Sequence, residues 1–155
     1  MTPSDDGLAL PAEAWHTERA LHRVLVRYAQ LCDQRDWAAI TEVFSDTASA
    51  SYGGWPLSDR AAILRMLQRN LGGCGPTQHL LGNLLLDHQA GTLCSRVSVR
   101  AAHRGAGALA EQTYECLGEY HDRWVHTARG WRIAHREMVI ALEFGSRAVL
   151  RPAQS

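Results

Sequence analysis

The sequence has 155 residues, of which 46% are hydrophobic, and this is enough to form the core of one compact domain. Its 16 Lys and Arg residues balance its 16 Asp and Glu residues, and it has no run of like charges of the kind that binds nucleic acids or anionic membranes. No apolar stretch is as long as a membrane span, and the acidic N-terminus is unlike a signal peptide, so we expect a cytoplasmic protein that binds neither nucleic acid nor membrane.

The cysteine and histidine patterns give no sign of a metal or cofactor site. The four cysteines contain no C-x-x-C pair, which argues against a zinc knuckle or a thioredoxin-type site, and we expect them to be buried, reduced thiols. No H-E-x-x-H or other ligand spacing is present, and the string GGCGPT follows a predicted helix rather than a strand. We therefore predict neither a metal nor a cofactor.

Three helices are predicted in the first half of the chain. From Ala12 onward, apolar residues recur at intervals of three and four, which predicts a long amphipathic helix. Residues 36–44 predict a short second helix with Asp36 as its N-cap. Residues 58–71 predict a third helix with Ser58 as its N-cap, and the glycines that follow are expected to end it.

The second half of the chain alternates with a period of two. Turn-forming strings separate four segments that predict long antiparallel strands, at residues 78–88, 92–104, 111–127 and 130–144. Helices followed by a strand meander indicate the α+β class, with a curved sheet that wraps the helices and leaves a pocket between the two layers. We expect one domain at residues 12–146, a flexible N-terminal arm at 1–11 and a C-terminal tail at 147–155.

Two polar side chains share faces with apolar residues. Asp33 lies at the margin of the apolar arc of the first helix, and His79 alternates in phase with Leu81, Asn83 and Leu85. Taken alone, Asp33 is equally explained as a half-exposed residue that helps to cap the next helix, and His79 as a core histidine bonded to a backbone carbonyl. Together they have the composition of a general base, because a carboxylate fixes the tautomer of a histidine and stabilises its imidazolium form.

The later strands carry further polar groups on their inward faces. His103 shares a face with Val97 and Val99. The next strand places on one face Tyr114, Cys116, Gly118, Tyr120, Asp122 and Trp124. In the last strand the apolar phase changes, which predicts a β-bulge near Arg136. We interpret the remaining histidines as surface residues: His16, His22, His88, His121 and His126.

Three strings of the sequence resemble the nuclear transport factor 2-like superfamily, in its branch of SnoaL-like proteins, scytalone dehydratases and hexachlorocyclohexane dehydrochlorinases. The strings are YAQLCDQRDWAAITEVFSD, TQHLLGN and GEYHDRWVHTARGWRIAHREM, and the likeness extends from about residue 15 to residue 145. The resemblance implies a cone-shaped α+β barrel and cofactor-free elimination of water or halide from a hydrophobic cyclic or polyketide-like substrate.

The resemblance also assigns roles to residues. It makes Asp33 and His79 a catalytic dyad, with His79 as the base, and it makes Tyr28 and His103 further catalytic residues. Tyr28, His103 or Tyr120 would polarise a carbonyl or the leaving group. Thr77 stands where dehydrochlorinase relatives have a cysteine. Pocket walls are expected from Tyr114, Tyr120, Trp37, Trp55, Leu81, Asn83 and Trp124, although bulky aromatic residues at such spacings are more often plain core.

Three functions compete on this evidence. The first is a dehydratase-type lyase, and the second is a cyclase or isomerase of a natural-product pathway that uses the same dyad. The third is a ligand-binding or assembly module without catalysis, because one fold supports many functions. Family members commonly associate through the outer face of the sheet, so we also expect a homodimer or homotrimer.

Overall fold

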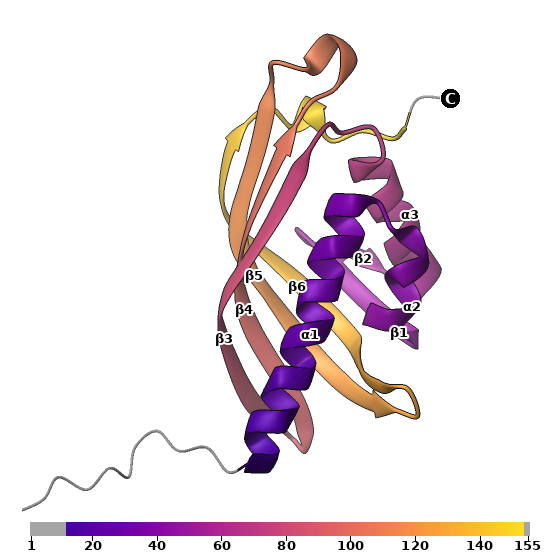
Figure 1. The fold of residues 1–155 in the computed structure, drawn as a ribbon, viewed down its shortest axis with the longest axis vertical. Coiled ribbons are helices and arrows are strands. Elements are labelled where there is room, and N and C mark those ends of the chain that lie inside the picture. Colours follow the sequence, from indigo (N-terminus) through magenta and orange to yellow (C-terminus); the bar gives the residue numbers. More distant parts are fainter. Residues whose placement is uncertain (1–11, 154–155) are drawn as a thin grey trace, which may run out of the picture.

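The computed structural model describes residues 12–153, in which one curved sheet packs against three helices (Figure 1). The sheet has six strands in the order β2-β1-β6-β5-β4-β3. In Figure 1 the long strands curve along one side of α1, while α3 lies on the side of β1 and β2. This arrangement is the predicted α+β architecture.

The three helices form where the apolar spacing predicts them. Helix α1 (Ala12–Gln34) buries one face, formed by Leu21, Leu25, Tyr28, Leu31 and Cys32. The expected second helix is instead a 3₁₀ turn (Trp37–Ala39) followed by the one-turn helix α2 (Ile40–Val43). Asp36 is the N-cap residue of the 3₁₀ turn, as predicted, but its side chain makes no capping hydrogen bond, and its carboxylate accepts one from Arg27 at 2.7 Å instead.

Helix α3 spans Arg60–Leu71. The predicted N-cap, Ser58, would have started it one residue earlier. The cap is Asp59 and not Ser58, because Asp59 Oδ1 accepts a hydrogen bond from the backbone N–H of Ala62 at 2.7 Å. A carboxylate at this position also interacts favourably with the positive end of the helix dipole. The helix ends at Gly72, as the glycine-rich string predicts.

The four long strands are confirmed, and two further strands were missed. The strands β3 (Thr77–Gln89), β4 (Thr92–Arg104), β5 (Thr113–Thr127) and β6 (Gly130–Gly145) form an antiparallel meander. The missed strands are β1 (Phe44–Tyr52) and β2 (Trp55–Leu57). Strand β1 pairs in parallel with β6, so a strand from the first half of the chain lies beside the last strand.

Register shifts in the sheet change which residues face the helices. In β6 the register skips Ala134, which confirms the predicted bulge near Arg136 and turns Arg136 to the buried face. In β3 the register shifts between Gly82 and Leu85, where Asn83 adopts a left-handed backbone with φ of 55°. Leu85 is therefore 58% exposed, and the prediction that it shares a face with His79 was wrong.

A buried ion pair lies in the core between α1 and the sheet. The guanidinium group of Arg136 donates through Nε and Nη2 to the two carboxylate oxygens of Asp122, both at 2.7 Å, and neither side chain is exposed. The Cζ atom of Arg136 lies 4.3 Å from the ring centre of Tyr28 and 4.0 Å from that of Tyr120. The two rings thus cover the buried cation with their π faces.

The segment after β6 packs against the domain over its described part. Val149 is fully buried, and the carbonyl of Arg151 accepts a hydrogen bond from Gly73 N–H at 2.7 Å. The predicted arm at residues 1–11 lies outside the described residues. All four cysteines are free thiols, and three of them are buried. No described helix has the length and hydropathy needed to cross a membrane.

Candidate active site

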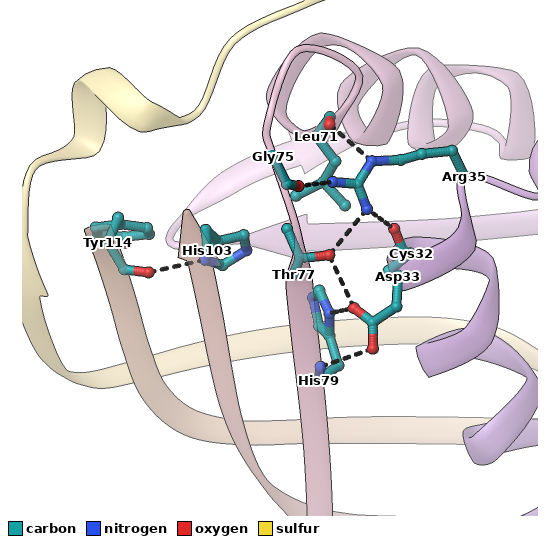
Figure 2. Close-up of polar contacts among 9 residues, drawn as sticks. All are labelled: Cys32, Asp33, Arg35, Leu71, Gly75, Thr77, His79, His103 and Tyr114. Carbon is teal, nitrogen blue, oxygen red and sulfur yellow. Dashed lines mark hydrogen bonds and ion pairs between the residues drawn. The ribbon is translucent and has the colours of Figure 1, made fainter. Parts of the chain in front are cut away.

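Asp33 and His79 meet between the end of α1 and the start of β3 (Figure 2). His79 Nδ1 lies 2.7 Å from Asp33 Oδ1, and the backbone N–H of His79 donates to Asp33 Oδ2 at 2.9 Å. The side chain of His79 is only 5% exposed and that of Asp33 23%. One carboxylate thus holds both the backbone and the ring of the same histidine.

This geometry fixes the tautomer of His79. An ionised carboxylate only accepts hydrogen bonds, so the proton of the neutral imidazole must lie on Nδ1. The Nε2 atom then carries the lone pair. In this tautomer Nε2 is the ring atom that can accept a proton.

The surroundings keep Asp33 in its charged form. Burial favours the neutral acid, but hydrogen bonds from the ring and backbone of His79 and from the hydroxyl of Thr77 outweigh it and lower the pKa of Asp33. The Thr77 hydroxyl donates to Oδ1 at 3.0 Å. The carboxylate thus stays negative beside the ring that it orients.

Arg35 is a polar neighbour that the sequence pattern did not single out. It follows α1 with a left-handed backbone, and its guanidinium group donates to Thr77 Oγ1 at 2.8 Å (Figure 2). The same group donates to the carbonyls of Cys32, Leu71 and Gly75. Three of its four acceptors are backbone atoms, which a sequence pattern does not reveal.

His79 also lines a cavity of about 380 Å³ between α1 and β3. Its wall is mostly aliphatic and includes Leu25, Val26, Ala29, Leu80, Leu81, Leu84 and Val97. The polar groups that line it beside His79 are His22 and Asn83. Its volume falls in the lower part of the range of ligand pockets, roughly 300–1,000 Å³. His79 thus borders a small, mostly apolar cavity.

A family model described as SnoaL-like domain matches residues 13–137 of this sequence. The chain belongs to the SnoaL-like domain family. This family is part of the nuclear transport factor 2-like superfamily, as the three sequence strings predicted. A sequence comparison with curated proteins finds no match.

Several solved structures share this SnoaL-like fold. The Kfla4162 protein from Kribbella flavida is 18% identical with a TM-score of 0.79, over 88% of this chain and 97% of that one. A scytalone dehydratase-like protein from Novosphingobium aromaticivorans is 18% identical with a TM-score of 0.73, over 90% and 94%. The type 3 hexachlorocyclohexane dehydrochlorinase of Novosphingobium barchaimii is 12% identical with a TM-score of 0.73, over 86% and 92%. At such identities the likeness shows the fold and leaves the activity open.

In this SnoaL-like domain a second histidine lies beside His79. The rings of His79 and His103 meet edge to face, with their centres 5.6 Å apart. His103 is buried, and its Nδ1–H donates to the carbonyl of Tyr114 at 3.1 Å, because a carbonyl only accepts. Burial, together with the nearby His79, lowers the pKa of His103 to about 4. His103 is thus neutral at pH 7 and carries a lone pair on Nε2.

The lowered pKa of His103 predicts a loss of stability in acid. In the unfolded chain this histidine takes up its proton near pH 6.5, whereas the folded protein resists protonation until about pH 4. Its contribution is therefore complete above pH 6.5 and is lost as the pH falls from 6.5 to 4, by up to about 3 kcal/mol. Urea unfolding at pH 7, 6, 5 and 4 is expected to show a smaller loss for His103→Gln.

The control for this experiment is His16, which is exposed on α1. The variant His16→Gln is expected to lose stability between pH 7 and 4 as the unchanged protein does. Equal slopes for His103→Gln and the unchanged protein would contradict the assignment of the acid-sensitive group.

Tyr28 lies close to the dyad but makes its polar contact elsewhere. Its ring meets that of His79 edge to face with centres 6.3 Å apart, and its hydroxyl lies 2.9 Å from that of Tyr52. Burial raises the pKa of Tyr28, so the phenol keeps its proton. Tyr28 is thus a buried, protonated phenol in the core beside His79.

The structure brings only some of the predicted pocket residues to this site. Leu81 and Asn83 line the cavity beside His79. Tyr114 and Tyr120 are buried in the core, where Tyr114 donates to Glu143 at 2.5 Å. The three tryptophans predicted as pocket walls lie elsewhere. Trp37 packs against the core, and Trp55 is 78% exposed. Trp124 lines a separate cavity of about 740 Å³ by the first turns of α1.

Residues 12–153 contain no group of three or more His, Cys, Asp or Glu side chains that could hold a metal ion.

Proposed function

We propose that this protein is a cofactor-independent lyase that eliminates water or another small leaving group from a hydrophobic cyclic substrate. The observation that carries the proposal is the Asp33–His79 pair, joined at 2.7 Å, whose histidine lines a mostly apolar cavity. The fold shared with dehydratase-like and dehydrochlorinase proteins supports the same class of reaction.

The proposed chemistry is proton abstraction by His79. Its Nε2 takes a proton from a carbon of the substrate, and the electron pair of the broken C–H bond forms the new C=C bond. The leaving group departs with its own bonding electrons, as halide or, after it takes the proton back from Nε2–H, as water. Asp33 stabilises the imidazolium ion that exists between the two proton transfers.

His103 and Tyr28 are proposed to assist in different ways. His103 is neutral and its Nδ1–H is already used, so its Nε2 can accept a hydrogen bond but not donate one. Tyr28 keeps its phenolic proton and can polarise an acceptor once it separates from Tyr52. The acid role thus falls to the protonated His79 or to Tyr28.

The wall of the cavity indicates a neutral substrate. Its aliphatic side chains offer no counter-charge to an ionised group, and burial of an unpaired charge there would cost several kcal/mol, on the order of the desolvation penalty of one ion. We therefore propose a neutral cyclic hydroxyketone or a related polyketide-like compound.

The mass of the product tests the proposal against its competitors. The purified protein is incubated with a panel of neutral cyclic β-hydroxyketones, and the products are analysed by mass spectrometry. A product that has lost one water is the expected result. A product of unchanged mass would assign a cyclase or isomerase, and binding without turnover would assign a ligand-binding module.

The partner of this domain is proposed to be a second or third copy of the same chain. The outer face of the sheet exposes large apolar side chains on β3 and β6, among them Leu80, Leu142 and Phe144. Apolar surface of this kind favours association. Light scattering at micromolar concentration should then give a mass above that of one chain.

A further inference from the structure

Arg35 joins the elements that carry the two members of the dyad. It follows α1, which carries Asp33, and its guanidinium group reaches the start of β3, which carries His79 (Figure 2). Nε donates to Leu71 O at 2.8 Å and Nη2 to Gly75 O at 3.0 Å. Nη1 donates to both Cys32 O and Thr77 Oγ1. One side chain thus ties the ends of α1 and α3 to the turn before β3.

The direction of the hydrogen bonds between Arg35 and His79 is fixed by chemistry. A guanidinium group only donates and an ionised carboxylate only accepts. The Thr77 hydroxyl between them must therefore accept from Arg35 and donate to Asp33 Oδ1. The same Oδ1 accepts from His79 Nδ1. The chain of hydrogen bonds from Arg35 through Thr77 and Asp33 to His79 therefore has only one arrangement of its donors and acceptors.

We infer that Arg35 and Thr77 are positioning residues for the Asp33–His79 base, and that they act on the charge and orientation of Asp33. This inference rests on the proposed function for its catalytic meaning. Neither residue lines the cavity beside His79, so they act through Asp33 rather than on a substrate.

The Thr77 hydroxyl has two effects on Asp33. It holds one carboxylate oxygen in the line of the His79 ring, and it stabilises the ionised form, which lowers the pKa of this carboxyl. The bond from Arg35 polarises the hydroxyl and makes it a stronger donor, because linked hydrogen bonds reinforce one another. Without the hydroxyl, Asp33 keeps its two bonds to His79 but loses the additional hydrogen bond to Oδ1.

The matched variants are Thr77→Val, which removes the hydroxyl with little change of shape, and Thr77→Ser, which keeps it. The readout is the titration of the Asp33 carboxyl carbon, followed by NMR in protein labelled at aspartate. In Thr77→Val the pKa of Asp33 is expected to rise by about one pH unit, which is the size of one hydrogen bond to a charged group. In Thr77→Ser it is expected to stay where it is.

A third variant tests the part played by Arg35. Arg35→Lys keeps the positive charge, but an ammonium group lacks the planar fork that reaches four acceptors. The pKa of Asp33 is expected to rise in this variant as well, by less than in Thr77→Val. If the pKa of Asp33 is unchanged in Arg35→Lys, Arg35 is not a positioning residue for Asp33.

The fold of each variant is checked by circular dichroism and by its thermal midpoint. A purely structural role would lower the midpoint without moving the titration of Asp33, and this result in Thr77→Val would overturn the inference. Once a substrate is identified, Thr77→Val is expected to lower kcat about tenfold with KM unchanged, and Thr77→Ser to restore it. If Asp33 responds as expected but the loss of His79 leaves turnover intact, the proposed function fails while the inference about Asp33 stands.

Discussion

Replacing His79 with glutamine is expected to reduce turnover of an elimination substrate by about 10³-fold, within the range that general acid–base catalysis contributes. A glutamine amide can still donate to Asp33, so the local fold should persist. It has no basic nitrogen, so it cannot remove a proton from carbon. The measurement is kcat on the substrate found by the product screen, with the thermal midpoint of the variant as a check of folding.

His121 provides the matched control for this experiment. It also pairs with a carboxylate, because its Nε2 lies 2.7 Å from Glu119, but it does not line the cavity beside His79. The variant His121→Gln is expected to keep its activity. Equal activity of the variants His79→Gln and His121→Gln would remove His79 from the mechanism.

The second large effect is expected on stability, in the variant Asp122→Ala. This change leaves the fully buried guanidinium group of Arg136 without its counter-charge and without two hydrogen bonds. Loss of one partner of a buried ion pair typically costs about 3–5 kcal/mol. Urea unfolding at pH 7 is expected to show a loss of this size in the free energy of unfolding.

A second variant separates the loss of the ion pair from the loss of packing. The double variant Asp122→Ala/Arg136→Met has no unpaired charge in the core, so it is expected to recover part of the lost stability. As a more exposed comparison, Glu115→Gln removes the negative charge from the pair with Arg100 on β4 and β5 and should cost less than about 1 kcal/mol. A double variant less stable than Asp122→Ala would show that Arg136 stabilises the core through the tyrosine rings instead.

The sequence predicted the parts of the fold that have strong periodicity. The four long strands alternate for more than ten residues each and are bounded by turn strings, so their positions were found within a few residues. Strand β1 was missed because it buries small side chains such as Ala48 and Ala50, which give a weak alternation signal. Its parallel pairing with β6 also depends on residues far away in the chain.

The candidate site shows the same division. The sequence singled out Asp33 and His79 because each is a polar residue that shares a face with apolar residues, and the family resemblance pairs them. Thr77 and Arg35 carry no such signal, because a threonine at the start of a strand and an arginine after a helix are ordinary surface residues in a sequence. Arg35 is held by backbone carbonyls, and Thr77 by the side chains of Arg35 and Asp33, and these groups meet only in the folded protein.

The bulges limited the prediction of inward faces. The phase change in β6 was visible in the sequence, yet the buried position of Arg136 was not inferred from it, because a buried arginine needs a partner and Asp122 lies on another strand. In β3 apolar residues stand on both faces, so the left-handed turn of the backbone at Asn83 left no trace in the pattern.

The parallel pairing of β1 with β6 has a consequence for synthesis of the chain. Strand β6 is the last of these six strands to leave the ribosome, and until then β1 has only the three-residue strand β2 beside it. Helix α3 and the 3₁₀ turn before α2 are therefore made before the sheet is complete. The pairing of Phe44 with Ile133, which joins β1 to β6, connects residues that are separated by most of the domain sequence. Chains truncated before β6 should consequently leave the facing edges of β1 and β5 unpaired, and unpaired strand edges are sites at which chains aggregate.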